Sequence, residues 1–202
     1  VKSSTISLDA SNYSNVENFT LTGSSNLDLT GGSGNETLTG NSGANILDGG
    51  SGDDTLFGGA GEDTIYGGSG DDVIYGGDES SIILGEKLYG GDGNDIFFGG
   101  TGVNNIWSGN GNDTIVFDKS SSINSISDFK RGEDKLLFDA TIFTSLTEIY
   151  DTNIKVVDIT YPRSISNSDY DSDDYLIYNK SKGELWYDKD GSGTQYSKFK
   201  IA

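Results

Sequence analysis

The stretch GGSGDDTLFGGAGEDTIYGGSGDDVIY, residues 49–75, decides the fold because one nine-residue pattern occurs in it three times without a break. Each unit has glycine at positions 1, 2 and 4, an acidic residue at position 6 and an aliphatic residue at position 8. A fixed period of this kind indicates a repeat architecture, in which each unit packs on its neighbours.

The same register extends from Gly31 to Val116 and gives nine units. Upstream are GGSGNETLT and GNSGANILD, and downstream a longer unit, GGDESSIILGEKLY at 76–89, is followed by GGDGNDIFF, GGTGVNNIW and SGNGNDTIV. The alternative, a flexible Gly/Asp-rich linker, would not keep position 8 apolar in all nine units and position 6 Asp, Asn or Glu in eight. We therefore predict a folded repeat block at 31–116, a run-in cap at 1–30 and a β-rich C-terminal region at 117–202.

The chemistry of one unit explains its layout. Glycine at positions 1, 2 and 4 permits positive φ, so the backbone can curl and turn its carbonyls inward. Positions 7 to 9 suit a three-residue strand that buries position 8. The predicted core consists of Leu38, Leu47, Leu56, Ile65, Ile74, Leu88, Phe97, Ile106 and Ile115.

This pattern resembles the repeats-in-toxin (RTX, hemolysin-type) family of calcium-binding nonapeptide repeats. The resemblance implies an all-β fold, a right-handed parallel β-roll in which two units form one turn, with Ca²⁺ between loops stacked on the same edge. Sorted by parity, the position-6 residues of one edge are Glu36, Asp54, Asp72, Asp95 and Asp113, and those of the other are Asn45, Asp63 and Asn104, interrupted by the long unit.

Calcium prefers carboxylate and carbonyl oxygens, and the number of charged ligands tunes its affinity, so we expect tighter sites on the first edge. Loop glycines are expected to complete the sites. These are Gly32, Gly34, Gly50, Gly52, Gly59, Gly61, Gly68, Gly70, Gly91, Gly93, Gly109 and Gly111.

Composition excludes several other classes of protein. The 13 Lys+Arg against 32 Asp+Glu give a net charge of −19, which makes a nucleic-acid partner improbable. The chain has no cysteine for disulfides and no histidine for a zinc site or a Ser-His-Asp triad. We therefore predict that it is not an enzyme, and no apolar run is long enough to predict a membrane span.

The flanks extend the family resemblance. Residues 22–30 form an imperfect repeat without an acid at position 6, and the alternation in Ile126 to Phe143 predicts antiparallel strands that cover the open end of the roll. The segment from Asp174 resembles the C-terminal element of proteins exported by type I secretion. The resemblance implies that the chain is the C-terminal end of a larger secreted or cell-surface protein such as an adhesin, whose partner during export is the type I machinery.

Two further features leave alternatives open. Asp188, Asp190 and Ser192 match the first half of an EF-hand-like calcium loop, but a hairpin turn explains the same residues. Position 9 predicts two aromatic ladders, Phe57, Tyr75 and Phe98 on one sheet and Tyr66, Tyr89 and Trp107 on the other. Exposed rings could bind a polysaccharide, whereas stacking on each other is the commoner reason for such ladders.

The sequence thus predicts a calcium-binding module that folds when it meets calcium outside the cell. The repeat block carries 14 acidic residues against the single Lys87, so without calcium it should stay expanded. The alternative is a carbohydrate- or surface-binding accessory module of an extracellular enzyme or adhesin.

Overall fold

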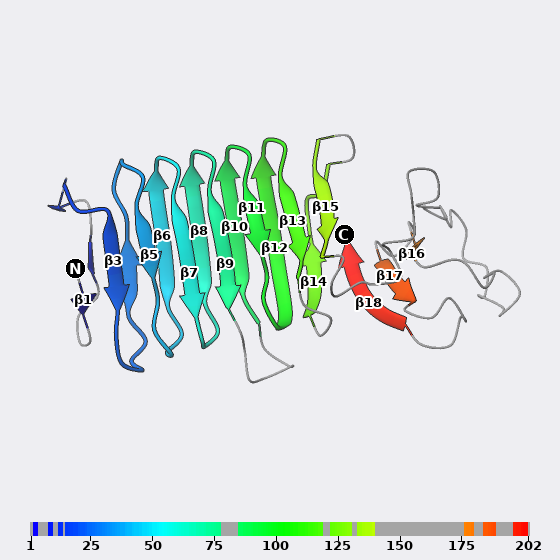
Figure 1. The fold of residues 1–202 in the computed structure, drawn as a ribbon, viewed down its shortest axis with the longest axis horizontal. Helices are drawn as coiled ribbons and strands as arrows, with labels where there is room; N and C mark the ends of the chain where they lie inside the picture. Colours follow the sequence, from blue (N-terminus) through cyan, green and yellow to red (C-terminus); the bar gives the residue numbers. More distant parts are fainter. Residues whose placement is uncertain are drawn as a thin grey trace, which may run out of the picture.

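The structure is a computed structural model that describes residues 2–3, 8–9, 12–13, 15–77, 85–118, 122–130, 133–139, 176–179, 184–188 and 196–201. Its described strands form two sheets that run along the long axis of the molecule, with the N-terminus at one end (Figure 1). In the described part, no helix is long and apolar enough to span a membrane.

The first sheet contains every odd-numbered strand up to β15. In order, they are β1 (Lys2–Ser3), β3 (Asn18–Leu21), β5 (Thr37–Thr39), β7 (Thr55–Gly59), β9 (Val73–Gly77), β11 (Ile96–Phe98), β13 (Thr114–Phe117) and β15 (Lys135–Phe138). All neighbours in this sheet pair in parallel.

The second sheet contains the even-numbered strands and the C-terminal ones. In order, they are β2 (Leu8–Asp9), β4 (Asp28–Thr30), β6 (Ile46–Ser51), β8 (Thr64–Ser69), β10 (Lys87–Asp92), β12 (Gly102–Asn110), β14 (Ser122–Ile126), β18 (Tyr196–Ile201), β17 (Glu184–Asp188) and β16 (Leu176–Asn179). Consecutive strands alternate between the sheets up to β15, so two repeat units form one turn of a parallel β-roll, as predicted.

The repeat register sets the pairing. Leu38 lies opposite Leu56, and Leu47 lies opposite Ile65, each exactly one turn of 18 residues away. Leu88 still pairs with Ile65 although the long unit puts 23 residues between them. The five extra residues of the long unit therefore leave the pairing register of the flanking strands unchanged.

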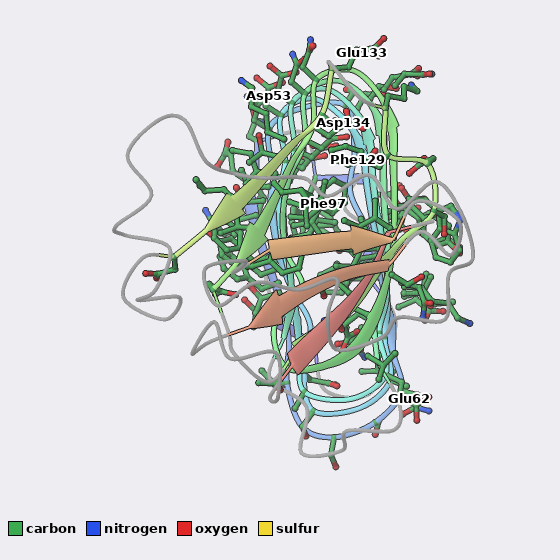
Figure 2. All side chains as sticks on the ribbon, turned by 90° about the vertical axis from the view of Figure 1, so that its right-hand side faces the viewer. Asp53, Glu62, Phe97, Phe129, Glu133 and Asp134 are labelled. Carbon is green, nitrogen blue, oxygen red and sulfur yellow. The ribbon has the colours of Figure 1, made fainter. Side chains whose placement is uncertain are left out.

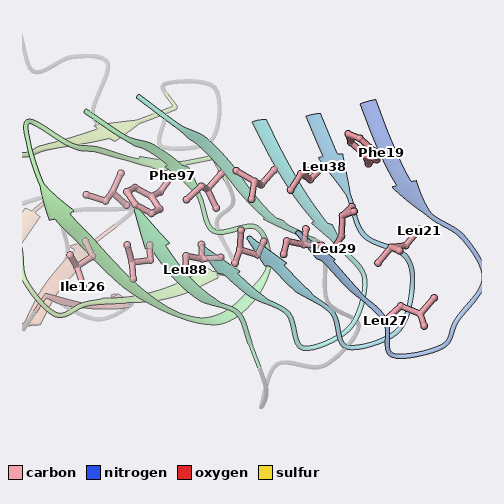
Figure 3. Close-up of a cluster of buried hydrophobic side chains, with 14 of the residues drawn as sticks. Phe19, Leu21, Leu27, Leu29, Leu38, Leu88, Phe97 and Ile126 are labelled. Carbon is pink, nitrogen blue, oxygen red and sulfur yellow. The ribbon is translucent and has the colours of Figure 1, made fainter. Parts of the chain in front are cut away.

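The core lies between the two sheets and is a double row of position-8 side chains (Figure 3). All nine predicted core residues are fully buried. The row continues past the repeats through Phe19 and Leu29 at one end and Phe117 and Ile126 at the other. Each unit alone has only one core side chain, so a single unit cannot form a core. Stacking the units buries the whole ladder, and this burial is the main apolar contribution to the stability of the fold.

The glycine prediction was right for positions 2 and 4 of the central loops but wrong for position 1. Gly50 and Gly52, for example, have φ of 100° and 108°. Gly49 at position 1 has no positive φ; a Cβ there would lie 2.5 Å from both the Asp54 carboxylate and the Gly67 carbonyl oxygen. Gly49 is therefore required for space, whereas the last unit has Ser108 at this position. Gly32 and Gly34 in the first loop also lack positive φ.

The predicted antiparallel arrangement of residues 126–143 was wrong in the described part. β14 pairs in parallel with β12, and β15 pairs in parallel with β13, so the roll continues for another turn after Val116. The alternation marked strands correctly but carried no information on their direction. Antiparallel pairing occurs later, between β16, β17 and β18, and β18 joins the edge of β14 in parallel.

Candidate metal centre

The loops between strands stack along two opposite edges of the roll. The first edge holds the loops that precede the odd-numbered strands, and the second edge those that precede the even-numbered strands. Figure 2 looks along the roll, with Asp53 and Asp134 at one edge, Glu62 at the other and Phe97 between them. Alternate repeat units therefore place their loops on opposite edges of the roll, as the sequence predicted.

The position-6 side chains of the first edge form a continuous column. One carboxylate oxygen of each residue accepts the backbone N–H of its counterpart one turn earlier. The pairs are Glu36 N to Asp54 Oδ1 (2.7 Å), Asp54 N to Asp72 Oδ1 (2.8 Å), Asp72 N to Asp95 Oδ1 (2.9 Å), Asp95 N to Asp113 Oδ1 (3.0 Å) and Asp113 N to Asp134 Oδ1 (3.2 Å).

The second oxygen of the four central carboxylates is buried and accepts no hydrogen bond within the described part of the molecule. These atoms are the Oδ2 atoms of Asp54, Asp72, Asp95 and Asp113. An uncompensated buried carboxylate is costly, and its cost is removed by a cation.

A backbone oxygen of the next loop lies near one of these carboxylate oxygens. Asp54 Oδ2 and the carbonyl oxygen of Gly67, in the next loop of the same edge, both lie 2.5 Å from the Cβ position of Gly49. Two acceptor oxygens thus converge on Gly49, where a side chain would clash with both. Carbonyl and carboxylate oxygens are the donor set that Ca²⁺ prefers.

The end loops of the column are built differently. Glu36 Oε2 accepts the N–H of Gly32 in its own loop (3.1 Å), and Asp134 Oδ2 accepts the N–H of Lys130 (2.7 Å). Asp134 thus has a backbone donor for each of its oxygens, and Glu36 has one for Oε2, whereas the four loops between them leave Oδ2 without a donor.

Burial raises the pKa of the central carboxyl groups. The pKa of Asp54 and Asp95 rises to about 7 and that of Asp72 to about 6, while that of Asp113 rises as well. Desolvation is the largest cause of the raised pKa in each case; the backbone N–H of the preceding turn opposes it, and neighbouring carboxylates add to it. For Asp113, a hydrogen bond with the Ser108 side chain also lowers the pKa. The calcium-free column therefore resists full ionisation at neutral pH.

The second edge carries fewer carboxylates. The N–H of Asn45 donates to Asp63 Oδ1 (2.7 Å), and the N–H of Asp63 donates to Glu86 Oε2 (2.7 Å). The amide groups at its ends donate instead: Asn45 Nδ2 to the Leu27 carbonyl (2.8 Å) and Asn104 Nδ2 to Asn124 Oδ1 (3.0 Å). Only the Asp63–Glu86 step of this described column brings two carboxylates together.

Three members of the columns were missed from the sequence: Glu86, Asn124 and Asp134. Each stands two residues before a core residue of its strand, namely Leu88, Ile126 and Leu136. Position 6 can be found by counting two residues back from the apolar residue at position 8, and this count would have identified all three. Counting forward from the loop glycines missed them, because the glycine pattern is interrupted in the long unit and after Val116.

Among the described residues, no group of three or more acidic side chains gathers closely enough to hold a metal by side chains alone. A metal in these loops must therefore take backbone carbonyls as further ligands. This requirement agrees with the curled loops, whose carbonyl oxygens face the neighbouring turn, as Gly67 O faces Gly49.

The aromatic ladders exist as predicted. Phe57–Tyr75, Tyr75–Phe98, Tyr66–Tyr89 and Tyr89–Trp107 stack with centroid distances of 4.5–4.8 Å and nearly parallel planes. The rings cover one another's faces, so the ladders present mainly ring edges to solvent. This arrangement favours the structural interpretation over a sugar-stacking surface.

The predicted EF-hand-like segment falls largely outside the described residues, which include Asp188 but neither Asp190 nor Ser192. Asp188 ends β17 and pairs with Tyr196 of β18 in antiparallel register. The two strands are thus hairpin neighbours, as the alternative interpretation requires.

A parallel β-roll with buried, uncompensated carboxylates beside carbonyl oxygens defines a calcium-binding repeat module. A family model described as RTX calcium-binding nonapeptide repeat (4 copies) matches residues 30–65, 49–83 and 85–118. This part of the chain belongs to that family, a calcium-binding repeat and not an enzyme family, and its loops bind Ca²⁺. A search of curated proteins finds no match.

Proposed function

We propose that the chain is a calcium-gated folding module at the secretion-associated C-terminal end of a larger exported protein, such as an adhesin. The observation that carries this proposal is the row of buried Oδ2 atoms that have no donor in the described structure. The roll buries these charges only at a high cost, and calcium removes that cost.

The column geometry suggests where the ions bind. We assign the strongest sites to the first edge, between the loops of Asp54, Asp72, Asp95 and Asp113, because these loops combine an open oxygen with positive φ at positions 2 and 4. Glu36 contributes less, since its Oε2 already accepts the N–H of Gly32 in its own loop. On the second edge, Asp63 and Glu86 form the one acidic step among the described loops. Asn45 and Asn104 are poorer ligands because their Oδ1 atoms are uncharged and already accept a backbone N–H.

The folding switch follows from electrostatics. The repeat block has a net charge of −13. At cytosolic calcium levels the carboxylates of the stacked loops therefore repel one another, and the chain stays expanded. Outside the cell, calcium binding supplies folding free energy, because the sites exist only when the loops are stacked.

Far-UV circular dichroism during a calcium titration tests the switch. The β-signal should be lost in EDTA, return with Ca²⁺ and not return with the same concentration of Mg²⁺, which keeps its waters and needs a tight octahedral site. A β-signal that survives EDTA unchanged would refute the proposal.

Secretion needs its own test. A reporter fused upstream of the chain and expressed with a type I exporter should reach the medium, and removal of residues 174–202 should retain it in the cell. Export that does not depend on this segment would contradict the assignment.

We do not propose carbohydrate binding as a second function. The stacked rings leave few ring faces for a sugar. A glycan array of the calcium-loaded protein should therefore show no retained polysaccharide.

A further inference from the structure

The last step of the first-edge column contains a side-chain cation. Counting back from Asp134 at position 6, the residue at position 2 of this loop is Lys130. Its ammonium group donates a hydrogen bond of 2.7 Å to the carbonyl oxygen of Gly109, which is at position 2 of the preceding loop on the same edge.

Position 2 is glycine in the four central loops of this edge. The carbonyl oxygens of Gly50, Gly68 and Gly91 are each the nearest atom to the Cβ position of the position-2 glycine one turn later. These carbonyls thus point the same way along the roll, and Gly109 ends the row. Its oxygen meets an ammonium group where the earlier ones meet another glycine.

A second contact fixes the Gly109 peptide from the other side. Asp128 Oδ1 accepts the N–H of Ser108 (2.8 Å), and Asp128 Oδ2 accepts the N–H of Gly109 (3.0 Å). Asp128 and Lys130 therefore bind the donor and the acceptor side of one loop segment, which holds the last turn against the repeats.

The carboxylate of this last loop is also satisfied internally. Asp134 Oδ1 accepts the N–H of Asp113, and Asp134 Oδ2 accepts the N–H of Lys130. The central loops combine two carboxylates with no basic residue at any loop position, since Lys87 in strand β10 is the single basic residue of the repeat block. The last step has its own positive charge.

We propose that Lys130 supplies the cation of the last step, so that the row of calcium ions ends at the loop of Asp113 and the final turn packs on the roll without an ion of its own. This inference rests on the proposed calcium switch. It makes Lys130 a positioning residue that fixes the number of ions and the C-terminal limit of the calcium-dependent structure. Because the charge of Lys130 is part of the chain, it is present at every calcium concentration. This end of the roll therefore offers a preformed surface on which the first calcium-loaded turn can pack.

Three variants of Lys130 and one control test the proposal. Lys130→Met removes the charge and keeps the stem; Lys130→Gly restores the repeat consensus; Lys130→Arg keeps the charge. Lys135→Met is the matched control, because Lys135 is exposed at the start of β15 in the same turn and carries the same charge. Bound calcium is counted by equilibrium dialysis with elemental analysis, and the calcium midpoint is measured by circular dichroism.

We expect Lys130→Met to raise the calcium midpoint about two- to fourfold, the effect of one charge-assisted hydrogen bond spread over about four cooperatively bound ions. Lys130→Gly should bind one more calcium than wild type. Lys130→Arg and Lys135→Met should match wild type in both readouts.

The proposal is overturned if Lys130→Met shifts the midpoint no more than Lys135→Met, or if wild type already binds as many ions as Lys130→Gly. Should Lys130→Met not fold at any calcium concentration, a folded Lys130→Arg supports the charge requirement and an unfolded one overturns it. Failure of the calcium switch looks different, because folding would then be independent of calcium in every variant.

Discussion

Replacing Asp72 by asparagine should have opposite effects with and without calcium. Asp72 is fully buried at the centre of the first-edge column, and burial raises its pKa from 3.8 to about 6. Each pKa unit is worth about 1.4 kcal/mol, so ionised Asp72 costs the calcium-free roll about 3 kcal/mol above pH 6. Asparagine keeps the acceptor for the Asp54 N–H and removes that cost.

Asparagine already occurs at the same repeat position elsewhere in this chain. Asn45 and Asn104 at the same repeat position donate their Nδ2 groups along the second edge. We therefore expect Asp72→Asn to stabilise the calcium-free roll by up to about 3 kcal/mol at pH 7.5. With calcium, loss of a ligand charge should weaken binding at least about tenfold.

The assay is circular dichroism: in EDTA, Asp72→Asn should show more β-signal than wild type, and at saturating calcium its stability is measured by guanidinium unfolding. Glu62→Gln is the matched control, because Glu62 is exposed on the opposite edge and its substitution removes the same formal charge. It should change stability by less than about 0.5 kcal/mol. If Asp72→Asn destabilises the protein equally in both conditions, the buried column is not the origin of the calcium dependence.

Three other outcomes are expected. Gly49→Ala should destabilise the calcium-loaded roll by about 1–3 kcal/mol, because its Cβ would meet Asp54 Oδ2 and Gly67 O at 2.5 Å. The control is Ser51→Ala, at an exposed position nearby, which should leave the thermal unfolding temperature unchanged. Equal effects of the two substitutions would refute the steric clash at Gly49. The calcium midpoint should be higher at pH 6 than at pH 8, because calcium must displace protons from Asp54 and Asp95, whose pKa is raised to about 7. In EDTA the sign reverses: the folded state binds more protons than the unfolded one between about pH 4 and 7, so acidification to pH 5 should increase the β-signal, and a loss there would contradict the raised pKa. Tyr89→Ala should cost more stability than Tyr66→Ala, since Tyr89 stacks on Tyr66 and Trp107 whereas Tyr66 stacks on Tyr89, and each pair is worth about 0.5–1.5 kcal/mol. Thermal unfolding of the calcium-loaded variants measures the difference, and equal losses would argue against the ladder.

The period of nine by itself determined most of the architecture. A residue such as Leu56 is buried because it recurs at a fixed distance from its neighbours in both directions, and that distance is written in the sequence. The same count placed Asp54 and Asp72 one above the other on one edge, with Asp63 on the opposite edge. Local repetition fixes these features because every turn contacts only the turns beside it.

The tertiary structure alone decided how the columns end and which carboxylates need a cation. Asp54 and Glu36 have the same repeat position, yet Glu36 Oε2 accepts an N–H of its own loop and Asp54 Oδ2 has no donor. Asp134 joins the column from a segment without the glycine pattern, and Lys130 reaches a carbonyl one turn earlier. These differences depend on loop conformation and on contacts between turns about 20 residues apart, which a nine-residue motif does not encode.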